Sequence, residues 1–173
     1  MTGTTGSAAE VAGLTLLVMR HSKTEQVAET DHVRRLTERG RADAGAAGAW
    51  VASTGLAPGI ILASTAARAE ETAELVATMA GVRRVELIDE LYGADGYEAL
   101  DIVSAAVPDG LTSAMVVGHN PAMAQLGFLI QADGAAEVRF PTSGIGAFGF
   151  DVTTWADVDE GHGRLLAAYT PGD

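Results

Sequence analysis

Short apolar runs alternate along the chain with longer segments that carry apolar residues at helical spacing. Short runs of apolar and partly β-branched residues, each ending abruptly in polar residues, are typical of strands buried within a sheet. The pattern therefore predicts four such strands before residue 120, over residues 14–19, 59–63, 82–88 and 113–117.

The segments after these runs carry the start and stop signals of helices. Thr37 has the side chain of an N-cap, Gly81 is suited to close a helix, and Asn120 followed by Pro121 predicts a cap and a first turn. We expect helices over residues 37–52, 66–79, 97–106 and 122–130, and loops over residues 25–35, 89–96 and 157–163.

Strands that alternate with helices indicate an α/β domain whose sheet is mainly parallel and is flanked by helices. Two further runs, 144–152 and 164–169, have no helix-length segment between them, so we expect them to pair antiparallel at an edge of the sheet. No internal repeat or linker divides the chain. We expect one domain over residues 14–173, preceded by a flexible tail over residues 1–13.

Composition narrows the class of protein. The chain has 173 residues, of which 47% are hydrophobic, and no cysteine, which excludes disulfides and cysteine-ligated metals. The formal net charge of −12 argues against nonspecific binding of nucleic acid, because such binding depends on basic side chains. No apolar run approaches the ~20 residues of a membrane helix. We therefore expect a cytoplasmic protein that binds neither nucleic acid nor a membrane; its oligomeric state stays open.

Basic residues gather where two of the predicted strands end. Arg20 and His21 follow the first strand, His119 follows the fourth, and Arg68 comes shortly after the second. Ligands of open α/β sheets bind beyond the carboxyl ends of the strands. These four side chains are thus expected at one site, and on an acidic protein they form a local positive cluster suited to an anion.

Three motifs in this order resemble those of the histidine phosphatase (phosphoglycerate mutase-like) superfamily, and most of all its small SixA-type phosphohistidine phosphatases. The motifs are Arg20-His-Ser-Lys23, Ser64-Thr-Ala-Ala-Arg68-Ala-Glu-Glu-Thr72, and Gly118-His-Asn-Pro121; the stretch Asp31-His-Val-Arg-Arg-Leu-Thr-Glu-Arg-Gly40 adds to the resemblance. The resemblance implies a three-layer, phosphoglycerate mutase-like fold. It also implies a phosphatase, and we expect no cofactor. A metal site made by the four histidines is not expected, because no two of them have the close helical spacing of zinc motifs and the neighbours of His21 are arginine and lysine, which repel a cation. Ser22 stands where the superfamily usually has glycine, and Arg35 where the small branch commonly has proline.

This resemblance, together with the chemistry of the side chains, assigns roles to the cluster. A neutral imidazole is a nucleophile near neutral pH, so we expect His21 to attack phosphorus and form a phosphohistidine intermediate. Arg20 and Arg68 would clamp the phosphoryl oxygens with their planar donor forks, and His119 would be a further donor.

The remaining candidates lie at the periphery of this cluster. Lys23 and Asn120 are candidate substrate-binding residues. Larger family members protonate the leaving group with a carboxylic acid after the third strand, which makes Glu90 the preferred candidate here and Asp89 the alternative. The small branch often works without such an acid, so a site with none stays open.

The substrate is left open between a phosphorylated protein carrying phosphohistidine and a small phosphorylated compound. A general phosphomonoesterase or mutase, and a catalytically silent phosphate-binding module, are the alternatives. His32 and His162 have no comparable context, and surface roles are expected for both.

Overall fold

The computed structural model describes residues 13–134 and 136–172, and within them six strands form one sheet in the order β3-β2-β4-β1-β5-β6. The strands are β1 (Leu14–Arg20), β2 (Ile61–Ser64), β3 (Val85–Ile88), β4 (Ser113–Gly118), β5 (Ile145–Phe150) and β6 (Arg164–Tyr169). The first four strands run parallel, whereas β5 pairs antiparallel with both β1 and β6. The predicted mainly parallel sheet with an antiparallel edge is confirmed. Of the expected tail over residues 1–13, residues 1–12 lie outside the described part of the chain.

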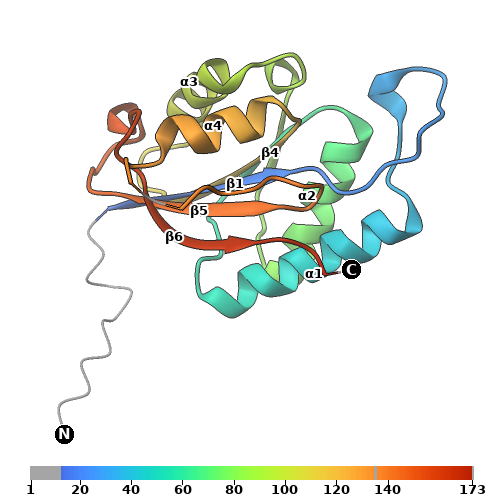
Figure 1. Ribbon diagram of the computed structural model, residues 1–173, viewed down its shortest axis with the longest axis horizontal. Helices are drawn as coiled ribbons and strands as arrows, with labels where there is room; N and C mark the ends of the chain where they lie inside the picture. Colours follow the sequence, from blue (N-terminus) through green and yellow to red (C-terminus); the bar gives the residue numbers. More distant parts are fainter. Residues whose placement is uncertain (1–12, 135, 173) are drawn as a thin grey trace, which may run out of the picture.

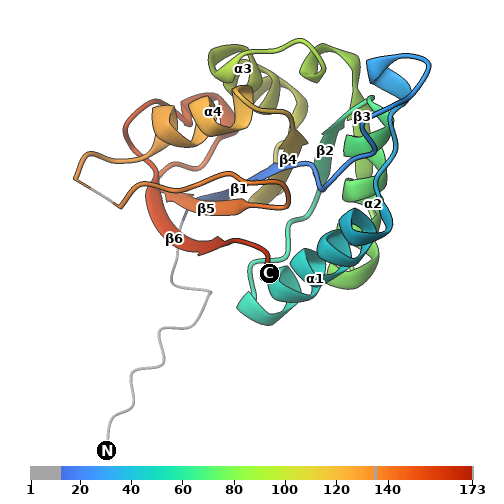
Figure 2. The same cartoon turned by 45° about the vertical axis from the view of Figure 1, so that its right-hand side comes forward.

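Helices cover both faces of this sheet, and the fold is the three-layer, phosphoglycerate mutase-like α/β arrangement. The helices are α1 (Glu38–Thr54), α2 (Ala67–Ala80), α3 (Gly96–Ala106) and α4 (Ala122–Ile130). Figures 1 and 2 show α1 and α2 on one side of the sheet and α3 and α4 on the other. No helix within the described residues is both long enough and apolar enough to cross a membrane.

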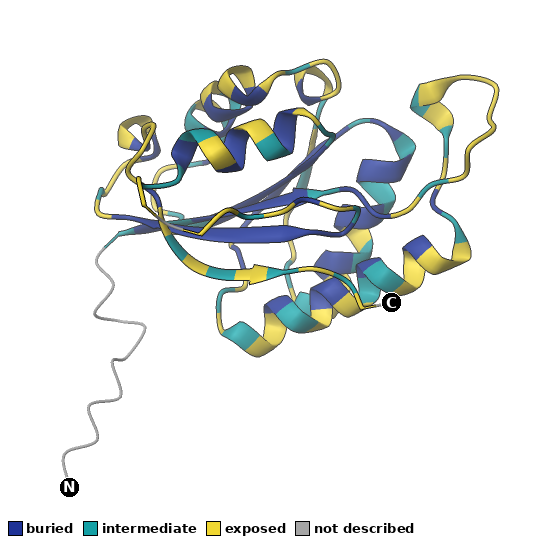
Figure 3. Cartoon of the chain, in the orientation of Figure 1, coloured by how far each residue is buried: buried dark blue, intermediate teal, exposed yellow. Residues whose placement is uncertain are grey.

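The central strand β1 explains why its sequence is a continuous apolar run. Leu16 and Val18 point to the core under α3 and α4, whereas Leu17 and Met19 point to the core over α1 and α2. A strand covered on both faces needs apolar residues at every position rather than at alternate ones. Figure 3 shows the sheet buried throughout its centre, with the exposed residues on the outer faces of the helices.

The helix signals in the sequence are mostly confirmed. Thr37 caps α1 by accepting a hydrogen bond from the N–H of Gly40, and Gly81 ends α2 in the left-handed conformation with φ 73°. Gly48 faces α2, where a Cβ would come within 3.0 Å of Val76, so it permits the close packing of these two helices.

Three local predictions need correction. The third strand begins at Val85 rather than at Val82, because its neighbour among the described strands, β2, offers four residues for pairing. The N-cap of α4 is Pro121, while Asn120 accepts instead from the N–H of Ala124 at 3.2 Å. The predicted loops 25–35 and 89–96 also contain short 3-10 turns, over Asp31–Val33 and Asp89–Leu91, and a third 3-10 turn, Trp155–Asp157, leads into the predicted loop 157–163.

Candidate active site

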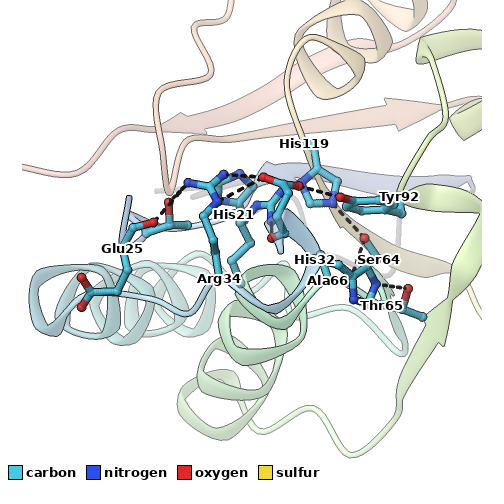
Figure 4. A network of polar contacts seen from close by, with 12 residues as sticks. His21, Glu25, His32, Arg34, Ser64, Thr65, Ala66, Tyr92 and His119 are labelled. Carbon is cyan, nitrogen blue, oxygen red and sulfur yellow. Dashed lines mark hydrogen bonds and ion pairs between the residues drawn. The ribbon is translucent and has the colours of Figure 1, made fainter. Parts of the chain in front are cut away.

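The ends of β1 and β4 bring two histidines together. The N–H of His21, the residue after β1, donates to the carbonyl of Gly118 at the end of β4 (2.9 Å). His119 is the residue after β4, and its ring centroid lies 5.2 Å from that of His21 (Figure 4). The sheet order therefore places the two rings side by side, although 97 residues separate them in the sequence.

The ring of His21 is oriented by its own backbone turn. Its Nδ1 lies 2.8 Å from the carbonyl oxygen of Ser22, and a carbonyl can only accept. Nδ1 therefore carries the proton, which leaves the lone pair on Nε2. The side chain is buried, and burial lowers the pKa of His21 to about 3, an effect that the contact with Ser22 opposes and the nearby His119, Arg68 and Arg20 reinforce.

His119 is held from the opposite side by Ser64, the last residue of β2. Its Nε2 lies 2.8 Å from the hydroxyl oxygen of Ser64, which already accepts from the N–H of Ala66. Nδ1 is buried and has no partner among the described residues. Burial, followed by the charge of Arg68, lowers the pKa of His119 to about 4, while Asp31 acts in the opposite direction.

Two arginines lie close to these histidines. Arg20 is the last residue of β1 and donates through Nη1 to the carbonyl of Phe140 (3.4 Å). Arg68 lies in the first turn of α2 and is 5% exposed. The Nε of each is buried without a partner among the described residues. Buried donors of this kind are nearly always satisfied in folded proteins. Nδ1 of His119 is a third such donor in the tautomer in which the Ser64 hydroxyl donates to Nε2.

Asp31, from the loop before α1, joins the cluster through Arg68. Nη1 of Arg68 donates to the Asp31 carbonyl (2.8 Å) and Nη2 to its carboxylate (2.9 Å). Arg34 donates to the same carboxylate at 3.1 Å, and the hydroxyl of Tyr92 does so at 2.6 Å. The Tyr92 hydroxyl, followed by Arg68, holds the pKa of Asp31 well below its usual range, and the carboxylate in turn raises the pKa of Tyr92. Asp31 is thus an anion that fixes one side of the Arg68 guanidinium.

His32 is partly exposed, and it also contacts residues near the cluster, which the sequence did not predict. Its Nε2 lies 3.1 Å from the hydroxyl of Thr65, and its ring packs edge-on against Tyr92 with centroids 4.8 Å apart. Tyr92 makes a similar edge-on contact with His119, at 5.6 Å (Figure 4). The rings of His32 and Tyr92 therefore extend the cluster on the side of His119. His162, in contrast, is exposed as expected.

The peripheral candidates do not join the cluster in the same way. Lys23, Asp89 and Glu90 are exposed, and none of these three side chains forms a hydrogen bond or ion pair with another described residue. Both ends of the Asn120 amide are engaged within the protein, since Nδ2 donates to the carbonyl of Phe140 (2.9 Å) and Oδ1 accepts from Ala124. The structure thus brings together Arg20, His21, Arg68 and His119, as the sequence predicts, without these four additional side chains.

Sequence reasoning missed Asp31, Tyr92 and Ser64 as parts of the site. Asp31 carries a usable signal, because an aspartate three residues before an arginine in a basic stretch can pair with it. Tyr92 and Ser64 carry none.

Two other features of the described surface lie elsewhere. Grooves of about 650 and 630 Å³ follow α3 and α4 and share Glu160, but neither is lined by any residue of the histidine cluster. The described residues also contain no group of three or more histidine, aspartate and glutamate side chains arranged to hold a metal ion.

The lowered pKa values predict that acid destabilises the fold before the carboxylates titrate. Unfolded histidine takes up a proton near pH 6.5, whereas folded His21 does so only near pH 3. Between these values the unfolded chain binds more protons, so the free energy of unfolding falls as the pH is lowered. We expect His21 to account for a loss of about 2 kcal/mol between pH 7 and pH 5. Urea unfolding at several pH values measures this loss. The prediction is contradicted if the free energy of unfolding changes equally with pH for the parent and for His21→Gln.

Comparisons with known proteins agree with this geometry. The family model of the histidine phosphatase superfamily (branch 1) matches residues 16–96. An uncharacterised protein from Mycobacterium tuberculosis is 34% identical over 162 residues, which span 88% of this chain and 99% of that protein. The SixA protein from Nakamurella multipartitia is 29% identical, with a TM-score of 0.82, over 93% of this chain and 98% of its own. SixA from Agrobacterium tumefaciens is 30% identical, with a TM-score of 0.76. This match covers 92% of this chain and 99% of the Agrobacterium chain. The chain therefore belongs to the histidine phosphatase superfamily, and its fold is most similar to that of SixA proteins among these structures.

Proposed function

We propose that this chain is a phosphatase that forms a phosphohistidine intermediate on His21 and acts on phosphohistidine in a partner protein. The observation that carries the proposal is the set of donors around a neutral imidazole. Nε of Arg20, Nε of Arg68 and Nδ1 of His119 have no protein partner among the described residues, and they lie in the cluster around His21. A phosphoryl group would supply the acceptor oxygens that these nitrogens lack.

The orientation of His21 suits the first chemical step. Because Nδ1 is engaged by the carbonyl of Ser22, Nε2 is the atom with the free lone pair, and the low pKa keeps it unprotonated at neutral pH. In this proposal Nε2 forms a bond to phosphorus while the bond from phosphorus to the leaving group breaks. Arg20, Arg68 and His119 then stabilise the charge on the equatorial oxygens. Water attacks in the second step, which breaks the P–N bond to His21 and releases inorganic phosphate.

The protonation states around His21 favour a leaving group that needs little help from an acid. His119 and His21 are neutral at pH 7, Asp31 is ionised, and Glu90 has no side-chain contact to a described residue of the cluster. An alkoxide from a phosphate ester requires a proton from a positioned acid, whereas the imidazole of phosphohistidine is readily protonated by water. This contrast, and the candidate phosphohistidine phosphatases among the similar structures, support phosphohistidine over an alkyl phosphate.

A panel of substrates tests this proposal. We expect release of phosphate from a protein or peptide carrying phosphohistidine, and at least about 100-fold slower turnover of an alkyl phosphate, because general acid catalysis is worth about 10²–10⁴-fold. Glu90→Gln should leave the first rate unchanged.

The alternatives give different results in the same panel. Turnover of alkyl esters that depends on Glu90 would replace the proposal with a general phosphomonoesterase. Phosphate binding by a folded protein, with no turnover of any substrate, would replace it with a silent phosphate-binding module.

A further inference from the structure

Three hydroxyl side chains lie fully buried next to the turn that carries His21. Ser22 follows His21 in the chain, Thr72 lies in α2, and Ser143 lies just before β5. The N–H of Ser22 donates to Oγ1 of Thr72 (3.0 Å), and the hydroxyls of Ser22 and Ser143 are 2.6 Å apart. We refer to Ser22, Thr72 and Ser143 together as the hydroxyl chain.

Each end of the hydroxyl chain is attached to the backbone of a cluster residue. At one end, Thr72 donates to the carbonyl of Arg68 (2.7 Å), one helical turn earlier. At the other end, the N–H of Ser143 lies 3.2 Å from the carbonyls of both Arg20 and His21. In the middle, the carbonyl of Ser22 accepts from Nδ1 of His21. The hydroxyl chain thus links the ring of His21 to α2, the helix that carries Arg68.

The hydrogen-bonding capacity of Thr72 is used within the protein, because its oxygen accepts from Ser22 and donates to Arg68. The hydroxyls of Ser22 and Ser143 are likewise paired with each other and have no exposure to solvent. The one hydrogen bond between the two serines uses only one of their two hydroxyl protons, but none of the three side chains is exposed. We therefore expect any effect of these side chains on catalysis to pass through His21 and Arg68.

Ser143 has an unfavourable backbone conformation in this arrangement. Its φ of 66° lies in the left-handed region, which residues other than glycine seldom adopt. In this conformation its N–H faces the β1 turn and its hydroxyl faces Ser22. A glycine would adopt this backbone conformation more easily, but it would lack the hydroxyl that contacts Ser22.

We propose that Ser22, Thr72 and Ser143 are positioning residues, which set Nε2 of His21 at its working distance and angle from the Arg68 guanidinium. The inference rests on the proposed function, since it concerns how that reaction is aligned. It also gives a role to Ser22 at a position where the superfamily usually has glycine: the added hydroxyl is the link to Ser143. Ser22→Gly and Ser22→Ala should then be equally impaired.

The decisive variant is Thr72→Val, which keeps the shape of the side chain and removes the acceptor of the Ser22 N–H. Its matched control is Thr78→Val, because Thr78 makes the same contact to the carbonyl four residues earlier in α2 but receives no bond from the β1 turn. We expect Thr72→Val to lower kcat about tenfold or more, because small misalignments of reacting groups carry rate penalties of that order or larger. The dissociation constant of inorganic phosphate should change less than threefold. Thr78→Val should leave both unchanged, and Thr72→Ser should restore kcat.

Coupling between the two serines gives an independent check. Because each hydroxyl is the partner of the other, Ser22→Ala and Ser143→Ala should each lower kcat, and the double variant should be no worse than the poorer single one. Additive losses would overturn the proposed link. Equal kcat for Thr72→Val and Thr78→Val, with both folded by circular dichroism, would overturn the proposal as a whole.

A readout without turnover separates this inference from the proposed function. In ¹⁵N NMR the parent should show His21 with its proton on Nδ1, and Thr72→Val should show a mixture of the two ring forms. If no substrate is hydrolysed but this change appears, the proposed function fails and the positioning role stands. If the ring form of His21 is the same in both proteins, the positioning role fails whatever the activity.

Discussion

His21→Ala is expected to abolish release of phosphate, with a loss of at least about 10³-fold, because it removes the imidazole whose Nε2 is unprotonated and free to attack phosphorus in the proposed reaction. Binding of inorganic phosphate should largely remain, since Arg20, Arg68 and His119 keep their donors. Stopped assays with a phosphohistidine peptide measure the first effect, and isothermal titration with phosphate measures the second.

His162→Ala is the matched control for this substitution, because His162 is exposed and lies outside the cluster. It should keep the activity of the parent. A base-quenched reaction with ³²P-labelled substrate should trap label on the parent and on His162→Ala but not on His21→Ala, because the P–N bond of phosphohistidine is stable in base and labile in acid. Full activity of His21→Ala would rule out the proposed intermediate.

Arg68→Met is expected to give the second largest effect, a loss in kcat/KM of about 10²–10³-fold. Losses of this size are typical when one preorganised donor to a developing charge is removed. The substitution keeps the apolar stem in the buried site but removes every donor, including the Nε that has no partner among the described residues. Arg68→Lys should recover only part of the loss, because a point charge cannot reproduce the planar fork.

Arg84→Met is the matched control, since Arg84 is exposed and its side chain pairs at 3.8 Å with the exposed Glu86. Asp31→Asn should give an intermediate loss of about tenfold, because Arg68 keeps its contact with the Asp31 carbonyl but loses the charged partner of Nη2. If Asp31→Asn were as damaging as Arg68→Met, Asp31 would have a direct part in the chemistry.

The part of the site that sequence reasoning placed well is the part fixed by the sheet. Arg20, His21 and His119 lie at the carboxyl ends of parallel strands, and such ends meet at one edge whatever the details of the loops. Arg68 follows for the same reason, because α2 begins shortly after β2 ends. Apolar runs and helix signals are local, so these elements can be read from short windows of sequence.

Apart from Ser64, which ends β2, the residues that sequence reasoning missed lie in loops. Asp31 and His32 lie in a segment without any hydrophobic period, and only packing against Arg68 and Thr65 shows that they reach the cluster. Tyr92 reaches the same carboxylate from a separate loop, 61 residues away. The spatial approach of two irregular segments depends on tertiary packing, which leaves no periodic trace in the sequence.

The position of β1 in the sheet has a consequence for synthesis of the protein. Both of its neighbours, β4 and β5, come about 100 residues or more later in the chain. At the usual 5–20 residues per second of a ribosome, β1 waits roughly 10 s with two open edges before either can pair. An unpaired apolar strand is a template for contact with other chains. The proposed nucleophile is therefore carried by one of the first elements made, yet it acquires its surroundings among the last. Until then α1 and α2, which follow β1 directly in the chain, are the elements available to cover one face of this strand.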